Sequence, residues 1–272
     1  MFQSRIAPPA KTDWRAYLVT ERWARYTLQD HATWDRLFER QLRAYRHDFV
    51  APFLRGIVRL DLQRPGIPRL DTLSDRLEAQ TGWRLVPVAG IVPDAAFFSM
   101  LADRRFPIGN FIRDGRQLDY LEEPDCFHDI FGHVPLLSHA PMAQAMQAMG
   151  HLGLAACAAG RGEEMSRLYW HTVEFGLARE DGALKLWGAG LASSFAEARH
   201  ALEAALPRPR FALGAALATP YRSDRFQPLY FVSDSVEDSC ARIAELTLEA
   251  LASLGEGEAP GYAREDERMA QI

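Results

Sequence analysis

Two histidines and one interior carboxylate are the residues of this sequence whose types and spacing could do chemistry. His128 and His133 lie five residues apart in the largely apolar segment 124–137. Neutral imidazole is the commonest metal ligand in proteins. Glu174 lies in the apolar and aromatic segment 168–177, and a buried carboxylate requires a cation, a proton donor or a metal as partner. Two imidazoles and one carboxylate form the facial triad of non-haem iron(II) sites.

The spacing of the two histidines constrains the helix that carries them. On a straight α-helix, residues five apart differ by roughly 140° in azimuth. The two rings therefore converge on one metal only if the helix is distorted or ends, and we expect this at Gly132 and the Val-Pro pair that follows His133. Asp125 precedes His128 by three residues, so on a helix its carboxylate is expected to accept the imidazole N–H that the metal does not use.

A simpler interpretation of these two segments remains open at this point. Two histidines near a helix end are more often unrelated than joined by a metal. Glu174 would then form a salt bridge with an arginine.

The elements that must position these residues are predicted to be mostly helices. Capping residues and apolar spacing predict helices that begin at Asp30, at Asp71 or Thr72, at Pro93-Asp94, and at Ser235 with Asp238. The first has an apolar stripe to Phe49, the second stops at Gly82, the third carries Phe97, Leu101 and Phe106, and the last runs from Val236 to about Leu254, closed by Gly255. Residues 83–89 are expected to be extended, and Pro87 among them predicts an edge strand or an irregular segment.

Strand signals are scarce and no repeated βαβ pattern is present, so we expect a mostly α fold with a few short β-strands (α+β). The chain of 272 residues contains no linker or repeat, and its six tryptophans and fifteen phenylalanines can fill one core. We therefore expect a single helical catalytic domain over 13–255, around a mononuclear iron site. Residues 1–12 are expected to be a flexible N-terminal lead and 256–272 a flexible C-terminal tail.

Charge and cysteine content limit the partners and the compartment. A net charge of -5 argues against binding to nucleic acid or an anionic membrane. No uncharged run approaches the roughly 18–20 residues that span a bilayer. The three cysteines are widely spaced and form no CxxC pair, which favours a reducing compartment. A cytoplasmic location is therefore expected.

Four blocks of sequence follow one another along the chain. They are Pro124-Asp125 with His128 and Gly132-His133-Val134-Pro135-Leu136; Tyr169-Trp170 with Thr172-Val173-Glu174-Phe175-Gly176-Leu177; Gly188-Ala189-Gly190-Leu191 with Ser193-Ser194-Phe195; and Phe226-Gln227-Pro228. Together they resemble the pterin-dependent aromatic amino acid hydroxylases, in particular the compact bacterial phenylalanine 4-hydroxylases. The resemblance runs from about Ala32 through Val232.

The resemblance implies functional roles for individual residues. His128, His133 and Glu174 would be the catalytic residues and the ligands of iron(II). The residues implied for substrate binding are Arg113 at the amino acid carboxylate, Ser193 at the same head group, and Pro124 and Trp170 beside the aromatic ring. The residues implied for binding a tetrahydropterin are Phe97, which would stack on the pterin ring, together with Gly90, Val92 and Asp129.

The implied reaction is the hydroxylation of L-phenylalanine to L-tyrosine with O2, in phenylalanine catabolism. Iron(II) and a tetrahydropterin (tetrahydrobiopterin or a bacterial analogue) would be the cofactors, and the partners would be these small molecules alone. The regulatory domain and the tetramerisation helix of the animal enzymes have no counterpart in this sequence, so we expect a monomer without feedback control by phenylalanine.

Three other functions fit the sequence less well. A zinc-dependent hydrolase would need histidines at i and i+4 with a general-base glutamate, whereas Asp129 follows His128 here. A 2-oxoglutarate oxygenase would need a β-barrel and a different ligand order. A binding module with a structural metal would leave Arg113 and the aromatic pocket without purpose. Within the family, Trp170 favours phenylalanine over tryptophan, and Ser223 lacks the charge that the tyrosine enzymes have nearby.

Overall fold

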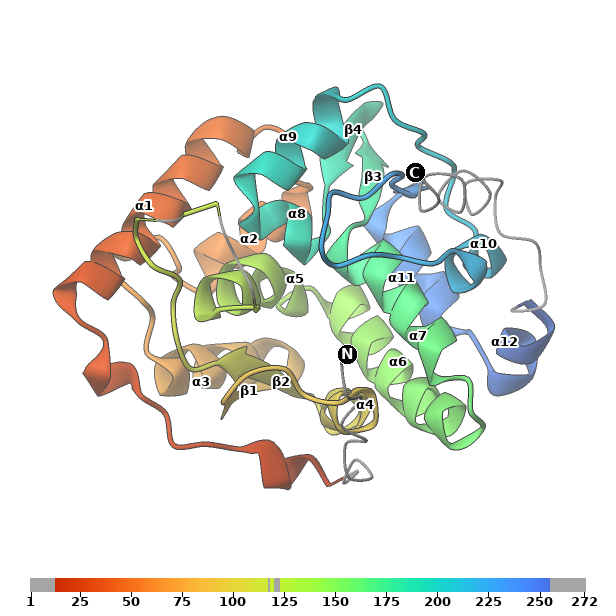
Figure 1. Ribbon diagram of the computed structural model, residues 1–272, viewed down its shortest axis with the longest axis horizontal. Coiled ribbons are helices and arrows are strands. Elements are labelled where there is room, and N and C mark those ends of the chain that lie inside the picture. The colour runs from red at the N-terminus through yellow and green to blue at the C-terminus, as the bar shows by residue number, and fades with distance from the viewer. Residues whose placement is uncertain (1–12, 117, 120–122, 255–272) are drawn as a thin grey trace, which may run out of the picture.

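The computed structural model describes residues 13–116, 118–119 and 123–254, and these form a mostly helical fold with a few short strands (Figure 1). This confirms the expected fold class. The α-helices are α1 (Leu28–Tyr45), α2 (Ala51–Arg59), α3 (Leu70–Thr81), α4 (Asp94–Ala102), α5 (Val134–Leu137), α6 (Ala140–Ala158), α7 (Gly162–Tyr169), α8 (Ala189–Ser193), α9 (Phe195–Glu203), α10 (Leu213–Ala218), α11 (Val236–Ala244) and α12 (Leu248–Leu254).

Four further helical segments are not α-helical. The segments η1 (Trp14–Tyr17) and η2 (Trp23–Arg25) are 3-10 helices, and η3 (His128–His133) and η4 (Trp170–Glu174) are π-helical. The expected lead 1–12 and tail 256–272 lie outside the described residues.

Several helix ends differ from the sequence-based predictions. The N-cap of α1 is Thr27 and not Asp30, because Asp30 occupies the third helical position and completes a capping box with Thr27. Helix α3 begins at Leu70 after Arg69, so neither Asp71 nor Thr72 is its cap. Its predicted end is confirmed, since Gly82 has the left-handed conformation with φ 77°.

The predicted last helix is two helices. Ser235 accepts the N–H of Asp238, as expected, but α11 ends at Ala244. Thr247 Oγ1 then accepts the N–H of Ala250 at 3.2 Å, so a new threonine cap begins α12. The predicted closing residue, Gly255, lies outside the described residues.

The helix α4 connects two parallel strands, β1 (Arg84–Val88) and β2 (Arg105–Gly109), in which Leu85 pairs with Phe106. Pro87 lies in a two-stranded sheet, in agreement with the predicted edge position. Phe106 was wrongly predicted on the helix. The chain leaves α4 after Ala102 and turns at Arg104, which has φ 53°, so Phe106 enters β2.

A second sheet has the order β4–β3–β5, with β3 (Leu177–Glu180), β4 (Ala183–Leu186) and β5 (Val232–Ser233). The antiparallel pair β3–β4 turns at Asp181 and Gly182, which both have positive φ, as the type I′ turn of a two-residue hairpin requires. Strand β3 follows η4 almost directly, so this sheet holds the chain that leaves Glu174.

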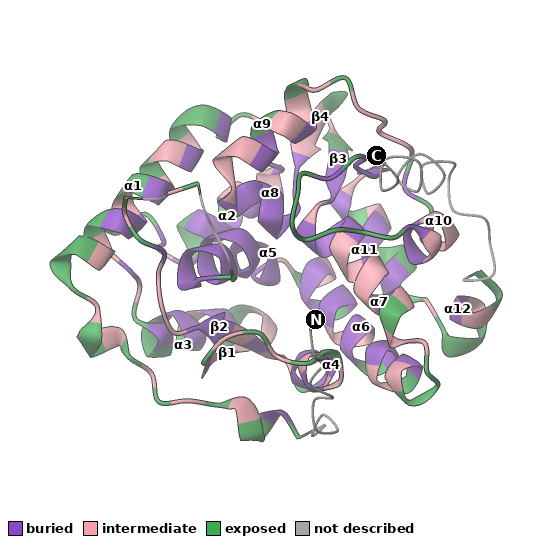
Figure 2. Ribbon diagram, in the orientation of Figure 1, coloured by how far each residue is buried: buried purple, intermediate pink, exposed green. Residues whose placement is uncertain are grey.

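The core lies around α5, α6 and α8, where the buried residues concentrate (Figure 2). Helices α4 and α6 are in close contact, because a Cβ on Gly150 would lie 2.2 Å from the backbone nitrogen of Ala102. Phe127 and Phe131, which flank the first histidine, stack with ring centroids 4.9 Å apart. Phe53 packs edge-on against Phe131, so aromatic packing anchors the apolar side of η3.

None of the helices within the described residues is both long and apolar enough to cross a lipid bilayer.

Candidate active site

The two histidines project from a π-helix, which confirms the predicted distortion. In η3 the turn is wider than in an α-helix, and hydrogen bonds of the i→i+5 type bring residues five apart onto one side. The ring centroids of His128 and His133 are 5.0 Å apart, and their Nε2 atoms are separated by 3.2 Å. Val134 and Pro135 then return the chain to the α-helix α5.

Glu174 ends the second π-helix, η4, and reaches both imidazoles. Its Oε1 lies 3.3 Å from His128 Nε2 and its Oε2 lies 3.3 Å from His133 Nε2. Ligand atoms bound at about 2.0–2.2 Å and near right angles around one metal lie roughly 3 Å apart. The three buried side chains are therefore spaced to hold a single ion.

Burial sets the charge of this site. It lowers the pKa of His128 to about 4 and the pKa of His133 to about 3, so both imidazoles are neutral near pH 7. Neutral imidazole is the form that binds a metal. Burial raises the pKa of Glu174, although the nearby His128 opposes this shift. A divalent cation would compensate for the buried carboxylate.

The other ring nitrogen of each histidine also has a partner. Ser193 Oγ lies 2.8 Å from His128 Nδ1, and Tyr169 Oη lies 3.5 Å from His133 Nδ1. The prediction that Asp125 would bond the His128 ring was wrong. Asp125 Oδ1 instead accepts the backbone N–H of His128 at 2.9 Å, because it stands at the start of that helix.

Arg113 and Asp125 form a buried, bidentate ion pair. Nε and Nη2 of the arginine donate to the two carboxylate oxygens at 2.8 and 2.9 Å, and the Arg113 backbone N–H donates to Oδ2. Burial alone would raise the pKa of Asp125, but the Arg113 guanidinium holds it below its usual value. The arginine Nη1 donates to the Leu118 carbonyl. Arg113 is thus fixed beside the helix that carries the histidines.

Small residues at and just before the start of α8 allow this helix to pack closely against both π-helices. A Cβ on Gly190 would lie 2.7 Å from Glu174 Oε1, and a Cβ on Gly188 would lie 2.4 Å from the Glu174 carbonyl oxygen. A Cβ on Gly132 would lie 2.8 Å from the carbonyl oxygen of Ala189. The Gly-Ala-Gly sequence therefore has a steric role, which is to bring Glu174 to the histidines.

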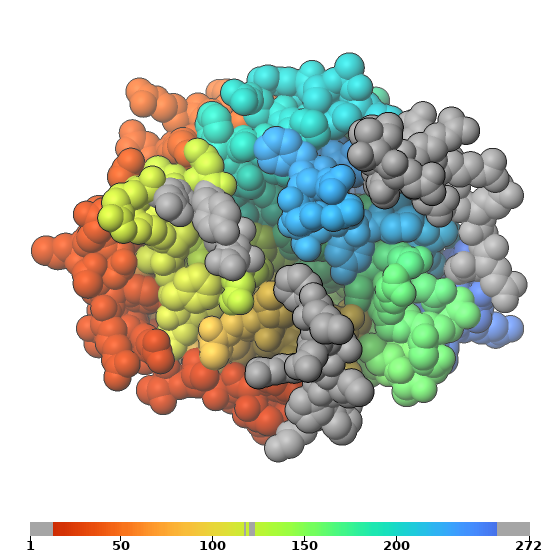
Figure 3. All heavy atoms as spheres, in the orientation of Figure 1, coloured from red at the N-terminus to blue at the C-terminus, as the bar shows by residue number. Residues whose placement is uncertain are grey.

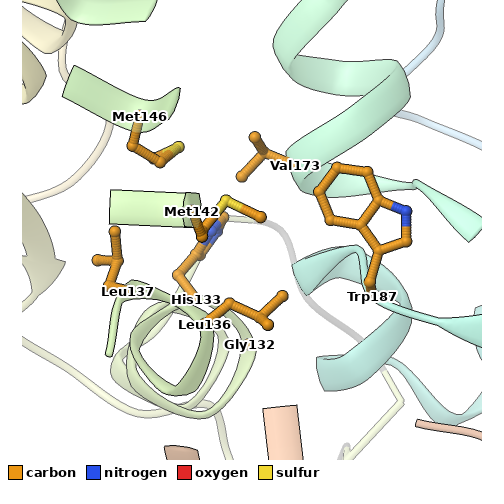
Figure 4. Close-up of a pocket in the computed structure, with 8 residues that line it drawn as sticks. All are labelled: Gly132, His133, Leu136, Leu137, Met142, Met146, Val173 and Trp187. Carbon is orange, nitrogen blue, oxygen red and sulfur yellow. The ribbon is translucent and has the colours of Figure 1, made fainter. Parts of the chain in front are cut away.

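A small apolar cavity of about 10 Å³ lies beside His133, and Figure 4 shows the ring of this histidine among apolar side chains. The cavity is lined by Gly132, His133, Leu136, Leu137, Met142, Met146, Val173 and Trp187. Its lining offers few polar partners, so ordered water is not favoured there. This packing supports the low basicity of His133.

Of the residues expected to bind a pterin, only Phe97 and Asp129 are linked to the histidine cluster by contacts. Phe97 packs edge-on against Tyr169, with ring centroids 5.2 Å apart, and Tyr169 in turn contacts His133. Asp129 is buried next to His128 and accepts the Gly109 N–H at 2.6 Å. Burial raises the pKa of Asp129 well above its usual value. Gly90 and Val92 lie in the loop before α4, where Val92 packs on a separate small cluster.

The residues expected at the substrate ring lie on two segments. Pro124 is exposed and precedes η3, whereas Trp170 is partly buried and begins η4. Trp170 stacks on Tyr221 with ring centroids 4.2 Å apart. Its indole N–H donates to Gln227 Oε1 at 2.9 Å.

Sequence reasoning assigned no role to Tyr169, Gly190 or Gln227, although all three lie in the blocks that carried the resemblance. Tyr169 directly precedes Trp170, and its hydroxyl group in an otherwise apolar segment could have indicated a hydrogen-bonding role at the site. The contacts of Gly190 and Gln227 join segments far apart in the chain, so a single sequence carries no signal for them.

Within the described residues, the fold brings together two histidines and one glutamate that could hold a single metal ion. A family model described as biopterin-dependent aromatic amino acid hydroxylase matches residues 19–252. The chain belongs to this family.

The chain is similar to bacterial enzymes named phenylalanine-4-hydroxylase. It is 45% identical over 231 residues to that of Caulobacter vibrioides, covering 85% of this chain and 78% of the relative. It is 48% identical over 214 residues to that of Ralstonia nicotianae, covering 78% and 68%. Similarity to the tyrosine 3-monooxygenase of Rattus norvegicus is lower, at 36% identity over 79% of this chain and 44% of the relative.

A solved structure of the phenylalanine hydroxylase from Chromobacterium violaceum superimposes with a TM-score of 0.81 and 40% identity, covering 88% of this chain and 85% of that one. That structure contains iron(III) and the oxidised cofactor 7,8-dihydrobiopterin. The expected family is therefore confirmed.

Proposed function

We propose that this protein is an iron(II)- and tetrahydropterin-dependent monooxygenase that converts L-phenylalanine to L-tyrosine with O2. The observation that carries the proposal is the convergence of His128, His133 and Glu174, with ligand atoms 3.2–3.3 Å apart, in a chain of this family. The named relatives with the higher identities are phenylalanine-4-hydroxylases, which favours phenylalanine over tyrosine as substrate.

His128, His133 and Glu174 are proposed to hold the iron. Two neutral imidazoles and one carboxylate fit iron(II) and leave other coordination positions open. Iron(II) bound here would, with a tetrahydropterin, supply the activation of dioxygen. The protein's own contribution is to keep both imidazoles neutral, to fix their rings and to exclude water around the three ligands.

The substrate is proposed to bind between the two π-helices. Arg113 would bind the amino acid carboxylate through guanidinium hydrogens that Asp125 and Leu118 do not take, while Asp125 holds the guanidinium in place. Pro124 and Trp170 would flank the aromatic ring. Ser193 contacts His128 directly, so we propose that its first role is to orient this ligand, with any effect on the head group being secondary.

The pterin is proposed to stack on Phe97, with Gly90, Val92 and Asp129 beside it. Phe97 is supported by the edge of Tyr169, which also contacts His133. A partly buried phenylalanine that is separated from a candidate ligand by one tyrosine ring would give the pterin ring a platform near the metal. The carboxylate of Asp129 already accepts the Gly109 N–H, so we propose that it positions the β2 backbone beside the pterin.

We also propose that the enzyme acts as a cytoplasmic monomer. Cys126, Cys157 and Cys240 are free thiols, which suits a reducing compartment. The large exposed apolar side chains of the described residues are spread along the chain from Leu18 to Leu254 and are not concentrated on one element, as is usual for a monomer.

Product analysis tests the proposed reaction. The protein is supplied with iron(II), a synthetic tetrahydropterin and each of phenylalanine, tryptophan and tyrosine. We expect phenylalanine to be hydroxylated faster than tryptophan or tyrosine, with tyrosine as its product. Faster hydroxylation of tryptophan would replace the substrate and keep the chemistry, and no hydroxylation of any of the three amino acids would reject the proposed function.

A further inference from the structure

Gln227 connects the candidate substrate slot to the surface loop that follows α10. Its Oε1 accepts the Trp170 indole N–H at 2.9 Å, and its Nε2 donates to the carbonyl oxygens of Arg222 and Arg225 at 2.8 and 3.2 Å. The residue is only 2% exposed. Both polar atoms of this buried amide therefore take their hydrogen-bond partners from the protein.

The main chain of Gln227 is also held. Its N–H donates to Glu197 Oε1 at 3.0 Å, and the same oxygen accepts the Tyr230 hydroxyl. Glu197 lies in α9 and is buried, so this helix fixes where the glutamine can stand. The position of the amide is set by α9 and by two carbonyls of the loop, and not by Trp170 alone.

The loop 219–228 crosses the face of the molecule turned toward the viewer in Figures 1 and 3, and it is tied to η4 at two further points. Tyr221 stacks on Trp170 at an interplanar angle of 17°, and His171 Nε2 bonds the Thr219 carbonyl at 2.9 Å. Phe175 packs on Trp170 as well, with an interplanar angle of 42°. Stacking limits the tilt of the indole, and the N–H bond to Gln227 selects its rotation in the ring plane.

We infer that Gln227 is a positioning residue for substrate recognition, which sets the orientation of the Trp170 indole as one wall of the phenylalanine slot. This inference rests on the proposed function and on the placement of Trp170 beside the substrate ring. Gln227 touches neither substrate nor metal in this account. Its effect passes through the indole N–H, which a phenylalanine at the same position lacks.

A double-mutant cycle tests the inference with the full chain, iron(II) and a tetrahydropterin. Gln227→Met, Trp170→Phe and the double variant are compared with the parent. Loss of one neutral hydrogen bond is expected to raise the KM for phenylalanine roughly two- to tenfold in the parent background. In the Trp170→Phe background the same change should be less than about twofold, because the coupling partner is absent. The KM for the pterin should not move.

Phe226→Leu is the matched control, because its side chain is half exposed and packs on His200 instead of Trp170. Gln227→Asn, which keeps the amide but is one methylene shorter, is measured in the same cycle in case the methionine variant does not fold. An equal effect of the Gln227 change in both backgrounds, or an equal rise in both Michaelis constants, would overturn the inference. A parent that forms no tyrosine would reject the proposed function, and the inference with it.

Discussion

The Nδ1 atom of His128 lies 2.8 Å from the hydroxyl oxygen of Ser193, 65 residues away in the chain. Because this bond occupies one ring nitrogen, the other, Nε2, faces Glu174 and His133. Partners of this kind fix the tautomer and the ring orientation of a metal-binding histidine. Ser193 is the last residue of α8, and Gly188 and Gly190 at the start of this short helix leave space for Glu174.

Ser193→Ala should therefore weaken iron binding roughly 10- to 100-fold, the usual effect of losing such a partner. The measurement is an iron(II) titration of the metal-free protein. Ser194→Ala is the control, since Ser194 caps α9 and its loss should cost stability without changing iron affinity. Unchanged iron affinity together with a raised KM for phenylalanine would place Ser193 at the substrate head group instead.

Gly190→Ala tests the steric role of α8. The new Cβ would lie 2.7 Å from both Glu174 Oε1 and the Phe175 ring, so these groups must shift, and we expect the shift to displace the carboxylate from the histidines. We expect iron affinity to fall at least about tenfold. Gly214→Ala provides the control, because its nearest neighbour would be 3.5 Å away. Parental iron affinity in both variants would show that Gly190 has no steric role at the metal site.

Removing Arg113 should affect both folding and substrate binding. Arg113→Ala leaves Asp125 buried without its cation, which costs on the order of 3–5 kcal/mol of unfolding free energy. Adding Asp125→Ala should restore part of that stability. The KM for phenylalanine should stay raised by roughly ten- to a hundredfold in the double variant, because the substrate carboxylate still lacks its partner. Denaturant unfolding and steady-state kinetics measure the two effects, and a double variant with the parental KM would show that Arg113 is purely structural.

His171 predicts a pH dependence of stability. Burial lowers its folded-state pKa to about 4, while its bonds to backbone carbonyls oppose the shift. Between about pH 6.5 and pH 4 the unfolded state binds more protons, so the free energy of unfolding falls as the pH falls through this window. The contribution is on the order of 3 kcal/mol. Denaturant unfolding at pH 7 and pH 4.5 should show a smaller loss for His171→Gln than for the parent or for a variant at the exposed His47. Equal losses in all three proteins would contradict this.

Local patterns predicted much of this structure. The spacing of His128 and His133 required a distorted helix, and η3 supplies it. Gly82 predicted a helix end through its conformational freedom, and Ser235 predicted a helix start through its side-chain oxygen. These features depend on a few neighbouring residues, which a sequence shows directly.

Features that join distant segments could not be predicted in this way. Asp125 is near His128 in sequence, but its carboxylate turned to Arg113, whose arrival depends on the fold. Ser193 reaches His128 only because α8 packs between the two π-helices. The apolar spacing of residues 236–254 predicts one continuous helix. The chain instead breaks between α11 and α12, because the Thr247 side chain caps a new helix.

The most direct test of the account measures iron content and tyrosine formation together in His128→Ala, His133→Ala and Glu174→Gln. A catalytic metal site completes a pocket, whereas a structural site holds the fold together. We therefore predict that each variant keeps the helical far-UV signal of the parent and loses both stoichiometric iron and phenylalanine hydroxylation. A variant that binds one iron per chain and forms tyrosine at the parental rate would contradict the assignment of that ligand, and unfolding of all three would indicate a structural metal.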